Sequence, residues 1–246
     1  VHAPLIYLQH GTLAIKKLGY TGRSYNNNIF RFCIYNKKML DVFSKENNFE
    51  PYQLYYAKYH PRYIEMIRRW DEYNKNKHDK KVILYFLTWR EYLKDNTSNS
   101  KLINDLIKIV NNKVLIKYLK DNNYIFKFCV HQFFDSNVLQ EVINTMDKDV
   151  FKIEYPGKVD VMDELVSCDI LITDYSSVGF ECTIMNKPVI LFTPDLKKYL
   201  RGRSIYCNID ELSKYSFSNV RDLVSSIVNK KYGVNNFFKS RLPKNI

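Results

Sequence analysis

Short hydrophobic runs alternate with amphipathic stretches along most of the chain, and the alternation becomes regular from residue 82 onward. Runs rich in β-branched and aromatic residues are typical of buried strands, and they predict strands at 4–8, 28–35, 82–86, 124–130, 150–153, 170–172 and 188–192. Apolar residues at helical spacing predict helices at 63–73, 101–120, 137–146, 161–167 and 220–229, a helix that begins within 37–43 and one helical turn at 195–200. Strands that alternate with helices indicate an α/β protein with a parallel sheet covered on both faces.

The pattern is interrupted at residues 74–81. This stretch, NKNKHDKK, is polar and charged and has no apolar residue, which is typical of a linker or a surface loop. We therefore place a domain boundary there, between a first part at 1–77 and a second part at 78–246. The chain starts with Val and enters a predicted strand almost at once, so we expect that a longer protein continues upstream.

Composition narrows the classes of function. The chain has 246 residues and a formal net charge of +12, which indicates an anionic partner: nucleic acid, a phosphate-bearing substrate or acidic lipid head groups. A biased genome is an alternative source of much of this charge. Five scattered cysteines without a CxxC spacing indicate buried thiols in a reducing compartment. No group of His and carboxylates has metal-ligand spacing, and no apolar run has the length of a membrane span.

The most informative stretch is DILITDYSSVGFECT, at residues 169–183. A short apolar strand ends at Thr173 and Asp174, Ser176 and Ser177 follow, and a helical pattern begins directly afterwards. In a parallel sheet such a turn lies at the carboxyl edge, where ligands bind. Two hydroxyls beside the free N–H groups of a helix N-terminus suit phosphate oxygens. The alternative is that one of the serines only caps the helix.

Other polar residues also follow predicted strands. His10 comes after the first strand and precedes a Gly-Thr pair that permits a sharp turn, Thr88 and Arg90 follow another strand, and His131 follows a third. We expect the residues that follow the parallel strands of one sheet to gather at one edge of it, together with the serine pair. A lone histidine is more often structural than catalytic, and this alternative stays open for His10 and His131.

Six blocks, in the same order, resemble the CDP-glycerol glycerophosphotransferases, the family of the teichoic acid polymerases and primases. The blocks are HGTLAIKKLGY, YHPRYIEMI, VILYFLTWRE, FKFCVHQFF, DILITDYSSVGFE and PVILFTPDLKKYLRGRSIY. The fifth is the most specific, since it is similar to DxLITDYSSxxFD in the family. The chain departs from the family pattern at His60, where a Gly is usual, at Leu87 and Gln132, which replace prolines, and at RGRSIY, which replaces RGFY. It also has one extra residue between Thr12 and Lys16.

The resemblance implies a GT-B-like α/β fold, with two Rossmann-like halves that face each other across a cleft. Residues 78–246 are then the complete donor-nucleotide half, and residues 1–77 are the end of the acceptor half. The implied enzyme is a transferase that moves glycerol phosphate, or a related alditol phosphate, from a CDP-alditol to a hydroxyl of a lipid-linked or polymeric acceptor and releases CMP. Such a reaction belongs to the synthesis of teichoic acid or of a capsule-type cell-envelope polymer.

The resemblance also implies roles for residues at matching positions. We expect His10 to be the catalytic base, because imidazole titrates near neutrality, and His131 to contact the donor diphosphate and help CMP leave. The expected ligands of the diphosphate oxygens are Ser176, Ser177, Thr12, Arg90 and Arg203. Asp174 is expected to orient the turn. Glu181 is expected either to reach a ribose hydroxyl or to lie on a solvated helix face. His60 is interpreted as structural, because the matching family position is not a His.

The simplest donor is CDP-glycerol, and no cofactor and no metal are expected. A lipid-linked acceptor implies a cytoplasmic protein that is peripheral at the inner face of the cell membrane, and no nucleic-acid partner is expected. Two alternatives stay open. One is a GT-B glycosyltransferase that uses a nucleotide sugar, which the HGT and TDYSS blocks disfavour. The other is a basic, non-enzymatic module that binds nucleic acid or an acidic membrane, in which histidines and serines at strand ends have no purpose.

Overall fold

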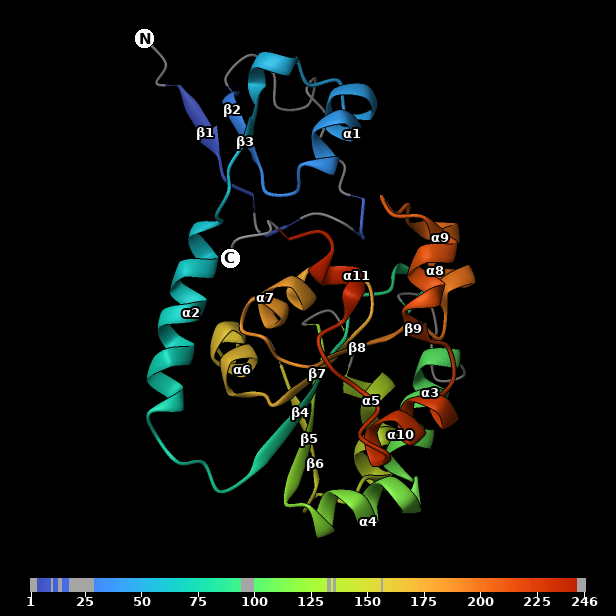
Figure 1. Cartoon of the computed structure of the whole chain (residues 1–246). Coiled ribbons are helices and arrows are strands. Elements are labelled where there is room, and N and C mark those ends of the chain that lie inside the picture. The colour runs from blue at the N-terminus through green and yellow to red at the C-terminus, as the bar shows by residue number, and fades with distance from the viewer. Residues whose placement is uncertain are drawn as a thin grey trace.

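A computed structural model of the chain describes residues 4–9, 11–12, 15–17, 29–93, 100–131, 134, 136–155 and 157–242. Two parallel sheets organise it, one of three strands and one of six (Figure 1). We refer to the three-stranded sheet with helix α1 as the small body, and to the six-stranded sheet with its helices as the large body. The prediction of an α/β protein with parallel sheets is confirmed.

The small body has the strand order β1–β2–β3, with strands Leu5–Tyr7, Ile29–Ile34 and Leu54–Tyr56. Helix α1 (Lys38–Glu46) lies against the sheet, where Phe32, Phe43 and Phe49 form a small aromatic core. A 3-10 turn at Pro51–Gln53 leads into β3. The sequence pattern does not predict β3, because it has only three residues and two of them are exposed tyrosines.

The large body has the strand order β6–β5–β4–β7–β8–β9, and every neighbouring pair is parallel. The strands are β4 (Lys81–Phe86), β5 (Tyr124–Cys129), β6 (Phe151–Glu154), β7 (Ile170–Thr173), β8 (Val189–Phe192) and β9 (Ser216–Phe217). β4 comes first in the sequence; β5 and β6 extend the sheet on one side, and β7 to β9 extend it on the other. The direction of strand addition therefore reverses between β4 and β7, and the crevice at the carboxyl ends of such a strand pair is where ligands bind in open α/β sheets.

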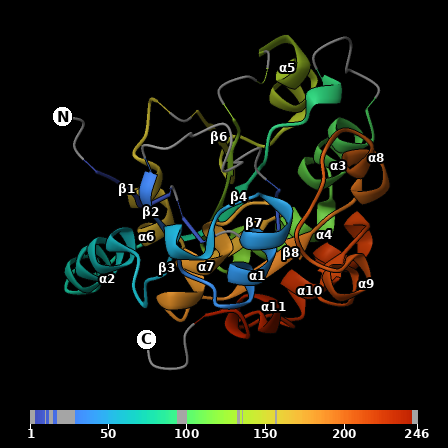
Figure 2. The same ribbon diagram turned by 90° about the horizontal axis from the view of Figure 1, so that it is seen from above.

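Helices cover both faces of this sheet (Figure 1, Figure 2). One face is covered by α3 (Lys101–Val110), α4 (Lys113–Asp121), α5 (Ser136–Thr145) and α10 (Val220–Val228), and the other by α2 (Pro61–Asn74), α6 (Val161–Ser167), α7 (Val178–Ile184), α8 (Leu196–Gly202), α9 (Ile209–Lys214) and α11 (Asn236–Lys239). Along β4, Ile83 and Tyr85 face the first group, and Val82 and Leu84 face the second. Strands buried on both faces need apolar residues at every position, which explains the uninterrupted hydrophobic runs.

The stretch at 101–120 is two helices, whereas the sequence pattern predicts one. Helix α3 has Asn111 as its C-cap, and Asn112 caps the start of α4 with a side-chain oxygen that accepts a hydrogen bond from the backbone N–H of Leu115. Asn is a strong helix-capping residue, so the Asn111–Asn112 pair is the sequence signal for this break. The pattern also does not predict β9, α9 and α11, which have two, six and four residues.

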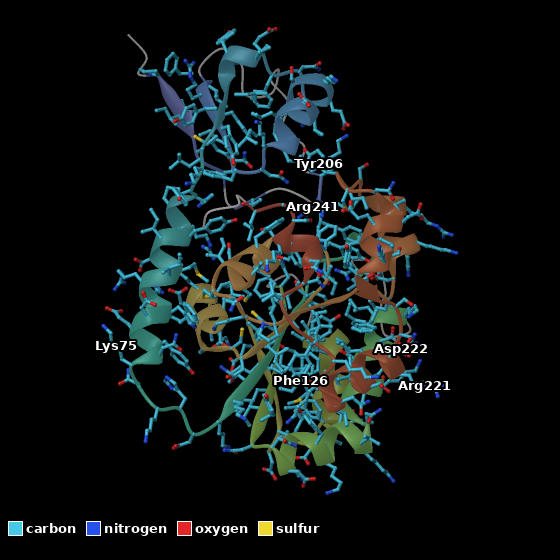
Figure 3. The ribbon with its side chains drawn as sticks, in the orientation of Figure 1. Lys75, Phe126, Tyr206, Arg221, Asp222 and Arg241 are labelled. Carbon is cyan, nitrogen blue, oxygen red and sulfur yellow. The ribbon has the colours of Figure 1, made fainter. Side chains whose placement is uncertain are left out.

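Helix α2 packs on the large body. Tyr63 and Met66 belong to the same core as β4 and β7, and Trp70 and Tyr73 pack against it. Residues 74–81 form the end of α2 and the exposed turn into β4, and Lys75 in Figure 3 lies at that end of the helix. The chain therefore passes from the small body to the large body at residues 57–60, before α2. The polar stretch at 74–81 begins only at the last residue of α2. The division into domains at residue 77 stays a prediction.

Candidate active site

Four strands of the large body end at the same edge. Phe86 at the end of β4 pairs with Cys129 of β5 and with Thr173 of β7, and Thr173 pairs with Leu191 of β8. The residues that follow these strands consequently lie side by side at the carboxyl edge. It is the edge where the sequence predicts that the polar residues gather.

Ser176 and Ser177 form the turn between β7 and α7, and both are half-buried. Ser177 is the N-cap of α7, but its side chain makes no capping hydrogen bond. The Oγ atom of Ser176 accepts only a long hydrogen bond, of 3.4 Å, from the backbone N–H of Val178. Helix capping therefore does not explain the hydroxyl of Ser177.

The first segment of the chain, by which we mean residues 11–12 and 15–17, reaches this serine turn. A methyl group added to Gly11 would lie 3.3 Å from the Oγ atom of Ser177 and 3.7 Å from the Oε1 atom of Glu181. The next residue, Thr12, is buried, and its hydroxyl is hydrogen-bonded to the phenol of Tyr63 on α2. His10 lies outside the described residues, but its neighbour Gly11 lies beside the turn. The HGT and DYSS blocks, far apart in the sequence, are therefore adjacent in space.

A second connection joins the same segment to the large body. The backbone N–H of Lys17 donates to the carbonyl of Ser204 at 2.9 Å, and that of Tyr206 donates to the carbonyl of Ile15 at 2.7 Å. The ring of Tyr206, labelled in Figure 3 where the two bodies meet, also packs against Phe43 of α1. Arg203, the half-buried C-cap of α8, directly precedes this contact. We call the region of these two connections, at Gly11 and at 15–17, the seam.

His131 follows β5 and is half-buried, with its ring centre 6.2 Å from that of Trp89. Burial lowers the pKa of His131 below its usual value, and the positive charge of Lys16 lowers it further. The imidazole is therefore neutral at pH 7, with one nitrogen that donates a hydrogen bond and one that accepts. Because Lys16 belongs to the first segment, the seam and the carboxyl edge of β5 are electrostatically connected.

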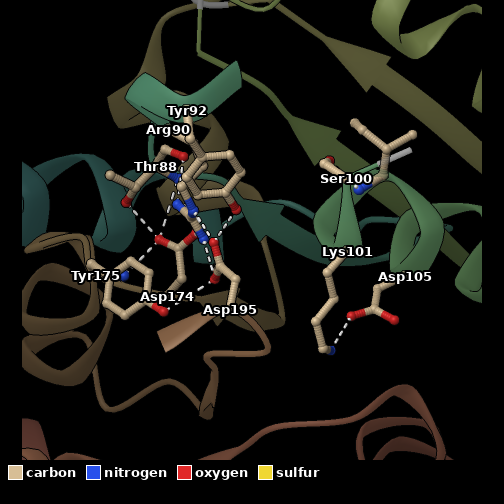
Figure 4. A network of polar contacts seen from close by, with 10 residues as sticks. Thr88, Arg90, Tyr92, Ser100, Lys101, Asp105, Asp174, Tyr175 and Asp195 are labelled. Carbon is tan, nitrogen blue, oxygen red and sulfur yellow. Dashed lines mark hydrogen bonds and ion pairs between the residues drawn. The ribbon is translucent and has the colours of Figure 1, made fainter. Parts of the chain in front are cut away.

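Arg90 does not present its charge to a ligand. Its side chain is fully buried, with 1% of the residue exposed. The Nε–H group donates to Asp195 at 2.7 Å, and another nitrogen lies 2.8 Å from a carboxylate oxygen of Asp174 (Figure 4). The third guanidinium nitrogen donates to the carbonyl of Thr88 at 2.6 Å. The expected contact of Arg90 with the diphosphate does not fit this arrangement, because its three nitrogens are already bound in the interior, and we remove Arg90 from the diphosphate ligands.

Asp174 fixes the start of the serine turn against the end of β4. Its carboxylate accepts hydrogen bonds from the backbone N–H of Thr88, from the Thr88 hydroxyl at 2.5 Å and from the backbone N–H of Tyr175 at 2.6 Å. Asp174 is itself completely buried. Its contacts are those of a residue that orients the turn.

Glu181 is buried, with 3% of the residue exposed, so the alternative of a solvated helix face is excluded. Its Oε1 atom accepts a hydrogen bond of 2.8 Å from the Nε–H of Arg62, and its Oε2 atom is buried without a hydrogen-bond partner in the described part of the chain. Burial raises the pKa of Glu181, and the charge and hydrogen bond of Arg62 oppose this shift. The carboxylate lies beside the contact between Gly11 and Ser177.

His60 has a structural role in the folded chain, at the N-terminus of α2. Its Nδ1 atom accepts a hydrogen bond of 3.0 Å from the backbone N–H of Arg62, and its Nε2 atom lies 3.4 Å from the carbonyl of Gln9. Gln9 has a φ of +64°, a left-handed conformation that is uncommon for residues other than Gly, and its side-chain amide donates to the carbonyl of Cys33 on β2. Contacts from α2 and β2 thus hold the residue that precedes His10.

Sequence reasoning does not single out three residues that contact this region: Arg62, Tyr63 and Asp195. Arg62 and Tyr63 lie in the YHPRYIEMI block, and their partners Glu181 and Thr12 are distant in the sequence. Asp195 follows β8, just as the other polar residues follow their strands. Its position after a strand is the signal that could have found it.

Two negative findings apply to the described ranges. No group of three or more His, Cys, Asp or Glu residues there could hold a metal ion. None of the helices in those ranges combines the length and apolar character needed to cross a membrane. The cysteines are unpaired, and all but Cys207 are buried, as the sequence predicts for buried thiols.

Comparison with known sequences gives a consistent result. The profile of the family described as CDP-Glycerol:Poly(glycerophosphate) glycerophosphotransferase matches residues 2–231. The chain is 30% identical over 155 residues to the teichoic acid poly(ribitol-phosphate) polymerase of Bacillus spizizenii. This match covers 62% of this chain and 23% of that protein. It is 35% identical over 129 residues to the teichoic acid glycerol-phosphate primase of Bacillus subtilis, with coverage of 52% and 30%. These matches span about a quarter to a third of the relatives' length.

A solved structure supports the fold. A variant of the wall teichoic acid polymerase TagF superposes with a TM-score of 0.66 over 95% of this chain and 60% of that chain, at 22% sequence identity. The GT-B-like arrangement that the sequence predicts is confirmed by this likeness. Since the family profile covers nearly the whole chain, the protein belongs to the CDP-glycerol:poly(glycerophosphate) glycerophosphotransferase family.

Proposed function

We propose that this chain carries the donor-binding part of a transferase that moves glycerol phosphate, or a related alditol phosphate, from a CDP-alditol to a hydroxyl of a lipid-linked or polymeric acceptor. The product is a teichoic acid or a capsule-type polymer. Membership of the family supports the reaction class. The observation that carries the proposal is the proximity of Gly11 to Ser177, because it places the HGT block beside the serine turn at the carboxyl edge.

The proposed reaction is a displacement at phosphorus. The acceptor oxygen attacks the β-phosphorus of the donor and forms a new P–O bond. The bond between that phosphorus and the oxygen that bridges to CMP breaks, and CMP leaves with the electron pair. The proton of the acceptor hydroxyl passes to a base, and we assign this role to His10.

Charge and hydrogen bonds stabilise the diphosphate in this proposal. Ser176 and Ser177 donate hydrogen bonds from their hydroxyls. Neutral His131 donates a hydrogen bond from its N–H group to the diphosphate and helps CMP leave. Lys16 and Arg203, both at the seam, supply positive charge. The hydroxyl of Thr12 already binds Tyr63, so we assign it to holding the HGT block rather than to the phosphate.

Glu181 contributes differently because an ionised carboxylate only accepts hydrogen bonds. Its Oε2 atom therefore suits a hydroxyl of the donor, such as a ribose hydroxyl, and repels phosphate oxygens. The acceptor, the cytoplasmic location at the inner face of the membrane and the absence of a metal requirement stay predictions. The relatives include both a ribitol-phosphate and a glycerol-phosphate enzyme, which supports a transferred unit of glycerol phosphate or another alditol phosphate.

Substitution of the two histidines tests the proposal. In the full-length protein we expect His10→Ala and His131→Ala each to slow CMP release from CDP-glycerol by about 100-fold or more, the usual contribution of general acid–base groups. His78→Ala is the matched control, because His78 is exposed on the turn after α2 and stacks on Tyr73. Near-normal rates in both variants contradict the mechanism, and turnover of UDP-sugars instead of CDP-glycerol favours a glycosyltransferase.

A further inference from the structure

A buried polar cluster ties together the loops that follow β4, β7 and β8 (Figure 4). Thr88 and Arg90 come from the loop after β4, Asp174 and Tyr175 from the loop after β7, and Asp195 from the loop after β8. These strands are neighbours in the sheet, on the two sides of the point where the direction of strand addition reverses. The cluster therefore lies directly below the edge where the donor is proposed to bind.

Arg90 is the centre of this cluster. Its planar guanidinium contacts both carboxylates at once, with distances of 2.7 and 3.2 Å to Asp195 and 2.8 Å to Asp174. Tyr175 and Tyr199 stack on each other with ring centres 3.7 Å apart, and the guanidinium lies 4.8 and 5.3 Å from their centres. Lysine is a point charge and cannot reproduce this fork, so the geometry is specific to arginine.

The carboxylate of Asp195 has several hydrogen-bond partners in the cluster. Besides Arg90, it accepts a hydrogen bond from the Tyr92 hydroxyl and one of 3.1 Å from the Tyr175 hydroxyl. Burial alone would raise the pKa of Asp195, but the charge of Arg90 and these hydrogen bonds outweigh it and leave the pKa lowered. The cluster thus holds two carboxylates and one guanidinium, and its excess negative charge makes it a poor direct ligand for a phosphate.

The cluster instead controls where the proposed ligands lie. Asp174 is followed directly by Tyr175 and then by the two serines of the turn. Asp195 is the N-cap of α8, and Arg203 is its C-cap. One guanidinium therefore sets the separation between the serine turn and the helix that carries Arg203.

We propose that Arg90 and Asp195 are positioning residues for the nucleoside diphosphate: they hold the serine turn and α8 at the spacing at which both reach the same phosphate groups. The inference rests on the proposed function, because it assumes that the serine turn and Arg203 bind the donor. It differs from the sequence expectation, in which Arg90 itself contacts phosphate.

A double-mutant cycle separates positioning from direct contact. The affinity of the full-length protein for CDP is measured by titration calorimetry for Arg90→Lys, Asp195→Asn and the double variant. Positioning predicts that each single variant weakens CDP binding by about tenfold or more, as small displacements of binding groups do, and that the double variant is no weaker than the poorer single variant. Direct contact predicts that Asp195→Asn binds CDP as tightly as the wild type or more tightly, since a negative charge is lost, and that result overturns the inference.

Two further variants keep the test independent of folding. Tyr92→Phe removes one hydrogen bond to Asp195 and leaves both charges in place, so we expect a smaller loss of CDP affinity of about two- to fivefold, as for one hydrogen bond. Glu164→Gln is the matched control, because it neutralises a largely buried carboxylate that pairs with Lys127 on β5, and it should leave CDP affinity unchanged. Cluster variants that lose stability but bind CDP normally overturn the inference.

CDP binding and CMP release by the wild-type protein distinguish a failure of the proposed function from a failure of this inference. A wild-type protein that binds CDP but does not release CMP from CDP-glycerol overturns the proposed reaction and leaves the positioning result standing. A wild-type protein that does not bind CDP overturns both.

Discussion

Arg90 and Arg62 have the same side chain in different surroundings, and burial is what separates them. Arg90 is enclosed between two aspartates, whereas the side chain of Arg62 is 29% exposed and forms an ion pair with Glu181. The sequence shows that Arg90 follows a strand, which favours a ligand contact. It does not show that Asp174 and Asp195 converge on it, because both lie far along the chain. The role of a buried charge is fixed by distant partners, and local pattern does not reveal them.

Gly11 provides a test at the same scale. An added methyl group would lie 3.3 Å from the Ser177 hydroxyl, closer than most such contacts, so the Ser177 side chain must shift by a few tenths of an ångström. We expect Gly11→Ala to lower kcat/KM by about tenfold or more, since catalysis is sensitive to small displacements, and to change the free energy of unfolding by less than about 1 kcal/mol. Steady-state assays and chemical denaturation measure the two quantities. Gly233→Ala is the control, because no atom of the described residues lies within 4 Å of its added methyl group. An unimpaired Gly11→Ala enzyme argues against close approach at the seam.

At the scale of elements, the long and strongly patterned segments are the ones that sequence predicts well. Helix α6 spans Val161–Ser167, as the pattern predicts, and β5 and β8 differ from their predicted ranges by one residue. Elements with few residues, such as β3 and β9, are not predicted from the sequence, because they bury too little apolar surface to leave a periodic signal. The pattern misses the break between α3 and α4 for another reason. One apolar face continues across Asn111–Asn112, and only the capping residues indicate the break.

The packing of α7 on α11 makes a prediction about stability. A methyl group on Gly179 would lie 2.2 Å from the ring of Phe238, so these two helices approach as closely as they do only because residue 179 is a glycine. We expect Gly179→Ala to destabilise the protein by about 1–3 kcal/mol through overpacking, although Ala is otherwise favoured over Gly within a helix. Urea denaturation measures the change. Phe238→Leu in the same chain should recover part of the loss, and strict additivity of the two substitutions contradicts the clash.

At the scale of the whole molecule, the alternation of strands and helices predicts the parallel sheet and the edge where polar residues gather, and the structure has both. The assignment of α2 could not be predicted in the same way. The apolar spacing identifies an amphipathic helix, but not which of its residues are buried or that Tyr63 and Met66 pack against the larger sheet. The pairing of residues 15–17 with 204–206 is likewise invisible to local pattern, because both segments are short and irregular. Contacts between the bodies are thus the part of the site that sequence determines least directly.

One interaction across the seam has a measurable effect on titration. The charge of Lys16 helps to keep the pKa of His131 low, because a nearby cation disfavours the imidazolium form. Lys16→Met should therefore raise the pKa of His131, and the rise should be partial, because burial is the larger cause and remains. NMR titration of the His131 ring measures this pKa directly.

Lys17→Met is the matched control for this measurement. Lys17 is the next residue, but its side chain pairs with Glu46 of α1 and lies over the ring of Tyr206. Removal of this charge should leave the pKa of His131 where it is. If Lys16→Met has no effect, or if both variants shift the pKa equally, the first segment does not approach His131 in the way the folded chain indicates, and the two bodies meet differently in solution. A selective shift in Lys16→Met means that the same lysine whose backbone pairs with Ile205 also helps to lower the pKa of the histidine at the end of β5.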